Sequence, residues 1–136
     1  MTINEIQDEI IEEFAFFDDW MEKYEYIIDL GKSLPLIDAQ YKDAEHLIKG
    51  CQSQVWLHAA NIGDKIDFTA DSDAIITKGI IALLVRVLSG QPAKAIAESH
   101  LYFVDKIGLK EHLSPTRSNG LVSMVKQMKM YGIALA

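Results

Sequence analysis

One cysteine could carry covalent chemistry in this sequence. Cys51 is the only cysteine in the chain of 136 residues, and it lies in the stretch "IKGCQSQVW". Gly50 precedes it and allows an unusual backbone conformation there. The polar residues that follow it are Gln52, Ser53 and Gln54. Reactive thiols occur in such accessible loops, because the thiolate is the nucleophile. Cysteine also packs as a small buried hydrophobe in many proteins, so both roles stay open at this point.

The four histidines are the other side chains suited to catalysis or metal binding. They are scattered, without the spacing of a zinc site, at His46, His58, His100 and His112. A surface or locally hydrogen-bonded role is expected for each. We expect no metal site, because tetrahedral zinc or an iron–sulfur cluster needs several Cys or His ligands. A thiol hydrolase that pairs Cys51 with His58 or His46 stays an alternative, although no known hydrolase or nucleotide-binding signature accompanies it.

The stretch "SPTRSNGL" is the second candidate for a functional role. As a structural element it is a turn-rich loop over 114–120 that enters a helix, with Ser118 or Asn119 as the N-cap. Arg117 is the residue with functional potential, because its guanidinium is a fixed cation with several donors near the positive end of a helix. It could steady a thiolate or a persulfide, or bind an acidic residue of a partner.

Composition restricts the functional classes. Acidic residues outnumber basic ones by 20 to 13, and the formal net charge is −7. Nucleic-acid binding generally needs a basic patch, and none is visible, so we expect no nucleic-acid partner. The most apolar stretch, 74–88, is shorter than the roughly 20 residues of a membrane span and contains Lys78 and Arg86. With no evident signal peptide and a free thiol, the sequence favours a cytoplasmic protein with no membrane partner.

A β-hairpin is predicted directly after Cys51. Residues 54–60 and 65–71 alternate with period two, and the Gly-Asp pair at 63–64 supplies the turn. Because the second run has one polar face, we expect an antiparallel sheet that is buried on one side. A short extra strand is expected around 46–49, just before the cysteine.

Helices are predicted on both sides of the hairpin. Spacings of three and four predict an amphipathic helix near the N-terminus and a second helix that ends at Gly31. The stretch "AIITKGIIALLVRVL" is apolar around most of its circumference, which is typical of a buried central helix, and Asp73 is placed to cap it. Shorter helical pieces follow to about Leu113, and a last helix runs from about Gly120. This order predicts a single α+β domain over residues 1–136.

Together these stretches resemble the SufE family of sulfur-acceptor proteins, including its CsdE group. The resemblance covers nearly the whole chain and rests on "HLIKGCQSQVWL", the hairpin, the apolar helix and "SPTRSNGL". It implies a protein that takes persulfide sulfur onto Cys51 from a cysteine desulfurase of the SufS or CsdA type, which uses pyridoxal phosphate. It also implies that the acceptor stimulates that enzyme, delivers sulfur for iron–sulfur cluster assembly, and has a small antiparallel sheet and helices similar to the IscU-type scaffold fold. The family's arginine and asparagine correspond to Arg117 and Asn119.

The count of one cysteine agrees with this chemistry. Persulfide transfer is thiolate attack on a sulfur–sulfur bond, so the acceptor needs one nucleophilic sulfur and no cofactor of its own. A second nearby cysteine would close a disulfide and release the sulfur. We expect Cys51 to be partly sheltered in the free protein and exposed by loop movement on docking. The expected supporting or partner-binding residues are Gly50, Gln52, Ser53, Gln54, Arg117 and Asn119.

Other functions stay open at this point. An iron-binding or cluster-binding scaffold would need ligands from a second chain, because one cysteine cannot hold a cluster alone. A sulfur relay to another thiolated product would use the same cysteine. An interaction domain in which Cys51 only packs is the remaining alternative. Downstream iron–sulfur scaffold proteins are expected as further partners if the sulfur goes to clusters.

Overall fold

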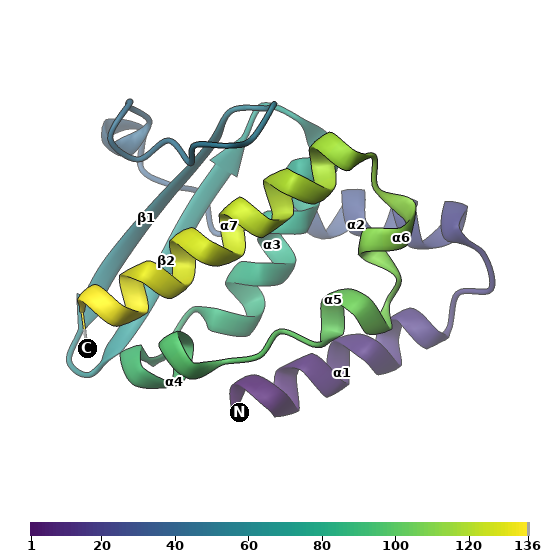
Figure 1. The fold of residues 1–136 in the computed structure, drawn as a ribbon, viewed down its shortest axis with the longest axis horizontal. Coiled ribbons are helices and arrows are strands. Elements are labelled where there is room, and N and C mark those ends of the chain that lie inside the picture. Colours follow the sequence, from purple (N-terminus) through teal and green to yellow (C-terminus); the bar gives the residue numbers. More distant parts are fainter. Residues whose placement is uncertain (136) are drawn as a thin grey trace.

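A three-stranded antiparallel sheet and seven α-helices make up residues 1–135, the part of the chain that this computed structural model describes (Figure 1). The strand order is β1-β2-β3. The α+β class predicted from the sequence is confirmed. The elements are α1 Ile3–Ala15, α2 Trp20–Gly31, a 3-10 turn at Ala39–Tyr41, β1 Val55–Ile62, β2 Lys65–Ser72, α3 Ile75–Leu88, β3 Gln91–Pro92, α4 Ala93–Glu98, α5 Phe103–Lys106, α6 Leu109–His112 and α7 Pro115–Ala134.

The predicted hairpin is confirmed. β1 and β2 pair antiparallel from Val55↔Ser72 to Ile62↔Lys65. Alternate residues of β2 are buried, as expected for a sheet with one covered face. α7 packs on this sheet, and the ring of Phe68 on β2 meets that of Tyr131 on α7 edge to face, with centroids 6.3 Å apart.

The extra strand expected before Cys51 is shorter than predicted. Leu47 forms a single antiparallel bridge with Trp56. Two backbone hydrogen bonds flank the bridge: the N–H of Ile48 donates to the carbonyl of Val55 at 2.8 Å, and the N–H of Leu57 donates to the carbonyl of His46 at 2.9 Å. The segment therefore extends the sheet by one residue pair beyond β1.

α3 is the central helix that its apolar sequence predicted. Ten of its fourteen residues are buried. It crosses α2 closely at Gly79. The helices are so near that a Cβ on Gly79 would collide with the carbonyl oxygen of Ile27. The predicted cap is wrong: Asp73 does not cap α3, and its carboxylate instead accepts a hydrogen bond from the N–H of Gln54 at 3.0 Å. The reason is the hairpin register, which places the end of β2 beside the start of β1.

α7 begins earlier than the sequence analysis predicted. Ser114 is its N-cap and accepts from the N–H of Arg117 at 3.3 Å, and Pro115 occupies the first turn. A capping serine followed by proline is a favoured helix start. The loop assigned to 114–120 is therefore the first turns of the helix, and Ser118 and Asn119 are wrong as N-caps.

Two long-range contacts secure α1. The guanidinium of Arg86 on α3 binds Glu9 at 2.6 Å and also Glu13. The buried amide of Gln7 donates to the carbonyl of His100 at 3.1 Å and accepts from the N–H of Phe103 at 3.1 Å. These contacts tie the first helix to the core and to the start of α5. Across residues 1–135, the helices all lack the combination of length and hydropathy that a membrane span needs.

Candidate functional site

Cys51 lies in a short loop between the Leu47 bridge and β1, pressed against α7. Its side chain is half-buried. The thiol donates a weak hydrogen bond to the carbonyl oxygen of Gly120, with 3.6 Å between Sγ and the oxygen. A Cβ added at Gly120 would lie 3.6 Å from the sulfur, which is an ordinary van der Waals distance, so Cys51 packs directly against this turn of α7. The partial shelter expected for the free protein is therefore present.

The two ends of the Cys51 loop are fixed by different means. At the C-terminal end, Gln54 and Asp73 exchange two hydrogen bonds: Asp73 accepts from the N–H of Gln54 at 3.0 Å, and its own N–H donates to the Gln54 carbonyl at 3.2 Å. At the N-terminal end, Gly50 has φ of +90°, a conformation that other residues rarely adopt. A Cβ at Gly50 would also lie 2.5 Å from Oγ of Ser123 on α7. Hydrogen bonds therefore hold the loop at Gln54, and the chain turns at Gly50 in a conformation that a larger residue would not readily adopt.

A small cavity of about 70 Å³ opens beside the sulfur. A water molecule takes about 30 Å³ in the liquid, so the space accommodates one additional heavy atom on Cys51. Three of the residues predicted to support Cys51 line the cavity with it, namely Gln52, Ser53 and Arg117. The other three, Gly50, Gln54 and Asn119, do not line it.

Sequence reasoning missed several residues of this cavity. Its walls also include side chains of α3 and α7, which are Thr77, Ile80, Thr116 and Met124. Thr77 is buried, and a threonine within an apolar helix gave no local signal of a site. Its position beside Cys51 follows only from the tertiary packing of α3 against α7.

Arg117 lies in the first turn of α7, and its side chain is held from a third element. Its Nη1 donates to the hydroxyl of Tyr24 on α2 at 3.3 Å. The guanidinium is exposed at the edge of the Cys51 cavity. An exposed cation therefore lies at the edge of the cavity beside the sulfur of Cys51.

The surroundings of Cys51 favour the neutral thiol. Burial raises the pKa of the Cys51 thiol above its ordinary value, because desolvation penalises the thiolate. The hydrogen bond to the Gly120 carbonyl acts in the same direction, since only the protonated sulfur can donate it. The positive end of α7 gives little compensation, because the helix begins at Pro115 and its dipole effect is confined to the first turn.

The structure places the four histidines in other contacts. The ring of His58 stacks on Tyr41 with centroids 3.8 Å apart, and His46 binds Asp43 through Nδ1 at 2.8 Å. The ring of His112 stacks on Trp20, and the ring of His100 lies near that of Tyr102, with centroids 6.3 Å apart. Around Cys51, within the described residues 1–135, no histidine lines the cavity, so the structure does not bring together the Cys–His pair of a thiol hydrolase. The same residues contain no group of three or more His, Cys, Asp or Glu side chains arranged to hold a metal ion.

Replacing Gly50 by alanine should loosen the Cys51 loop. The positive φ costs a residue with a side chain about 1–2 kcal/mol, and the new methyl would collide with Ser123. We expect iodoacetamide to label Cys51 several-fold faster in Gly50→Ala than in the natural protein. Gly63→Ala is the matched control, because Gly63 also has a positive φ, of 66°, but no atom lies within 4 Å of its added Cβ. Equal acceleration in both variants would contradict a specific role for the Gly50–Ser123 contact.

The raised pKa of Cys51 predicts a pH dependence of labelling and of stability. The midpoint of the labelling rate should lie at higher pH in the folded protein than in the chain unfolded in urea. Because the folded state holds this proton more tightly, the free energy of unfolding should fall as pH rises from the unfolded to the folded pKa. Subtracting the pH profile of Cys51→Ser isolates this contribution from lysines and tyrosines. Identical midpoints in the two states would show that burial does not affect the thiol.

Comparisons with known proteins identify the family of this chain. The SufE family, described as an Fe-S metabolism associated domain, matches residues 8–132. Two uncharacterized SufE-like proteins are similar to this chain. That of Rhizobium etli is 44% identical over 90% of this chain and 86% of the relative. That of Rhizobium meliloti is 42% identical over 90% of this chain and 91% of the relative. The SufE-like protein 1, chloroplastic/mitochondrial, of Arabidopsis thaliana is 39% identical, and 93% of this chain matches 34% of it.

A solved structure shares the fold. The solution structure of a hypothetical protein from Thermus thermophilus has a TM-score of 0.78 with 19% identity, covering 96% of this chain and 95% of that one. The expected likeness to the IscU-type scaffold fold stays a prediction. Since the family match spans most of the chain, and relatives at about 40% identity carry the same family name, the chain belongs to the SufE family of Fe-S metabolism associated domains.

Proposed function

We propose that this protein is a sulfur acceptor that takes persulfide sulfur from a cysteine desulfurase onto Cys51. The observation that carries the proposal is the half-buried Cys51 thiol beside a cavity with room for one more heavy atom. Membership of a family associated with Fe-S metabolism supports sulfur as the cargo. The protein is an accessory to the desulfurase and has no turnover of its own.

The transfer step needs only the sulfur of Cys51 from this chain. The Cys51 thiol loses its proton, and the thiolate attacks the outer sulfur of the persulfide on the desulfurase cysteine. The sulfur–sulfur bond of the donor breaks, its cysteine leaves as a thiolate, and a persulfide forms on Cys51. One sulfur atom moves between two cysteines with no net oxidation or reduction, so the step requires no metal and no external electron donor.

Docking has to change the environment of Cys51 before this attack. The free protein keeps the thiol protonated and hydrogen-bonded to Gly120, whereas the reaction needs the thiolate. Movement of the loop away from the Gly120 carbonyl would expose the sulfur and bring it toward the cation of Arg117. The partner would be a desulfurase that uses pyridoxal phosphate, and its stimulation follows from faster removal of its persulfide sulfur. Delivery of this sulfur to cluster assembly and a cytoplasmic location are part of the same proposal.

Mass spectrometry tests acceptance of sulfur directly. The protein is incubated with a cysteine desulfurase and free cysteine, and its intact mass is measured with and without reductant. We expect sulfur adducts that reductant removes on the natural protein and none on Cys51→Ser. A natural protein that stays unmodified with SufS-type and CsdA-type desulfurases would overturn the proposal.

Arg117 should contribute to the rate of transfer more than to stability. Loss of a hydrogen bond to a charged group costs about 1.5–3 kcal/mol, and about 1.4 kcal/mol corresponds to a tenfold change in rate. We therefore expect Arg117→Ala to lower the rate of sulfur acceptance about tenfold or more while its melting temperature stays close to that of the natural protein. Tyr24→Phe, the control, removes the hydrogen bond to Arg117 but keeps the cation, and should retain most of the rate. A fall in melting that parallels the fall in rate would make Arg117 structural.

A further inference from the structure

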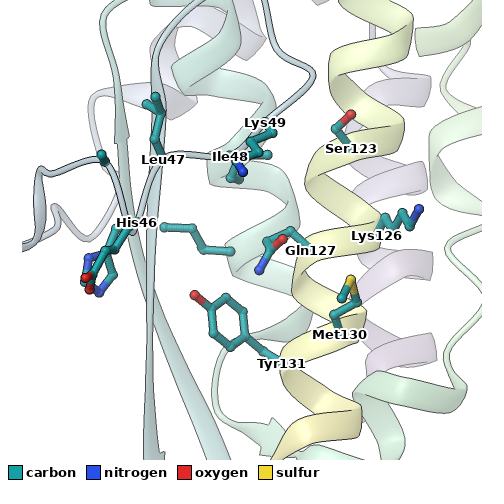
Figure 2. A pocket seen from close by; sticks show the side chains of 12 residues that line it. His46, Leu47, Ile48, Lys49, Ser123, Lys126, Gln127, Met130 and Tyr131 are labelled. Atoms are coloured by element: carbon teal, nitrogen blue, oxygen red, sulfur yellow. The ribbon is translucent and has the colours of Figure 1, made fainter.

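A groove lies beside the Cys51 loop, and none of its lining residues lines the small cavity. It has a volume of about 500 Å³ and lies between the segment 44–49 and the middle of α7 (Figure 2). The segment 44–49 is the one that forms the single bridge with β1. The groove is thus bordered by the last extended backbone of the sheet on one side and by a helix on the other.

The backbone of Leu47 has unused hydrogen-bonding groups at this edge. The two hydrogen bonds that join the segment to β1 use the carbonyl of His46 and the N–H of Ile48. In an antiparallel pair of this kind, the N–H and carbonyl of the residue between them point away from the partner strand. Consistent with this, neither group of Leu47 has a hydrogen-bond partner within residues 1–135. An extended peptide could pair with them as an added strand.

The side of the groove formed by α7 offers alternating polar and apolar contacts. Figure 2 shows Gln127 and Tyr131 pointing from the helix toward the opposite segment. Ser123 and Met130 line the same side of the groove. Leu57 of β1 adds an apolar side chain to the lining. In the described part of the chain, the side chains of Ser123, Gln127 and Tyr131 make no hydrogen bond to another residue. An extended peptide alternates its side chains between two directions, which suits a groove that is polar in one place and apolar in the next.

Two lysines give the groove a local positive charge. Lys49 and Lys126 both line it and are exposed, and neither forms an ion pair within residues 1–135. One carboxylate, that of Glu45, lies at the other end of the segment. The two cations contrast with the formal charge of −7 of the whole chain. They favour a peptide with carboxylates on the part that lies nearest to Cys51.

The groove leads to the reactive sulfur. Lys49 is two residues before Cys51, so their Cα atoms are at most about 7 Å apart. On α7, Ser123 is one helical turn beyond Gly120, whose carbonyl accepts from the thiol of Cys51, and one turn corresponds to about 5 Å. A peptide paired with Leu47 therefore brings its end close to the cysteine.

We propose that this groove binds an extended, acidic segment that flanks the cysteine of a sulfur-transfer partner, through strand pairing with Leu47 and charge contacts with Lys49 and Lys126. The inference rests on the proposed function of Cys51, because it assigns the bound segment to the partner that exchanges sulfur there. Pairing aligns the partner cysteine with Cys51 before the sulfur is attacked. Backbone pairing supplies the affinity, and the lysines select the charge of the segment.

Peptide binding tests the strand pairing without any sulfur transfer. The full chain carrying Cys51→Ser is titrated with a fluorescent peptide of alternating valine and glutamate, followed by anisotropy. Two further peptides carry N-methyl groups on all valines or on all glutamates. We expect one of the two to lose affinity about tenfold or more and the other to bind as the parent does, because only every second N–H of a paired strand faces its neighbour. Loss in both peptides, or in neither, would overturn strand pairing.

Hydrogen exchange locates the pairing on this chain. Exchange of the Leu47 amide should slow at least tenfold when the peptide saturates the protein, and an unchanged Leu47 rate would overturn the assignment of the groove.

The charge of the groove is tested by substitution on α7. Lys126→Glu should weaken binding of the peptide several-fold. Lys129→Glu is the matched control, because it makes the same charge change on α7 at a residue that does not line the groove. If both variants weaken binding equally, the peptide senses only the overall charge of the protein. That result would overturn the selective role of Lys126.

A cysteine at one end or the other of the peptide tests the alignment. The peptide cysteine is supplied as a disulfide with 2-thiopyridine, so that the Cys51 thiolate attacks the peptide sulfur, thiopyridine leaves and a mixed disulfide forms. With the natural protein, we expect this exchange to be about tenfold faster from one peptide end than from the other, and equal rates would overturn the alignment. The binding measurements use Cys51→Ser, so they can fail while sulfur adducts still form on the natural protein. They can equally succeed while no adduct forms, and the two proposals are therefore distinguished.

Discussion

The α3 helix has to be covered on every side, because ten of its fourteen residues are buried and most are large aliphatic side chains. Burying each such side chain contributes roughly 1.5–3 kcal/mol, so the elements around α3 are arranged to exclude water from it. The sheet covers one side through β2, and α1, α2 and α7 cover others. The close crossing at Gly79 fixes α2 against the helix. The residues Thr77 and Ile80 of this same helix form part of the cavity beside Cys51, which makes the site an extension of the core.

The site combines a rigid support with a thiol of low reactivity. The pair of hydrogen bonds between Gln54 and Asp73 fixes one end of the loop, and at the other end Gly50 has a positive φ and leaves no room for a side chain beside Ser123. Burial and the Gly120 carbonyl both keep the sulfur of Cys51 protonated. Oxidation follows thiolate character and exposure, so burial and the hydrogen bond to Gly120 also protect the sulfur of the free protein.

Local patterns in the sequence predicted the elements well, because their signals lie within a few residues. The period-two runs predicted the hairpin, and the apolar stretch predicted α3 as a buried helix. The start of α7 was harder, since Ser, Pro, Asn and Gly favour both turns and helix starts. The whole stretch 114–120 therefore looks like a loop in the sequence, although Ser114 and Pro115 are the stronger helix-start signal.

Contacts between distant segments could not be predicted in the same way. The sequence identified Cys51 and Arg117 as candidates, but the tie between Arg117 and Tyr24 joins residues far apart in the chain. Asp73 had an obvious local role as a cap, and the hairpin register overrode it by placing Gln54 beside it. The groove depends on the packing of the segment 44–49 against α7, for which neither segment carries a local signal.

The single bridge at Leu47 also bears on how the protein behaves at high concentration. An exposed strand edge invites pairing between copies and, if it is long and flat, leads to aggregation. Here the extended backbone ends within a few residues, because Gly50 turns the chain with its positive φ. Lys49 adds a charge that two adjacent copies would both present. The edge is too short and too charged to propagate a sheet from one molecule to the next. The backbone of Leu47 therefore stays unpaired without promoting self-association.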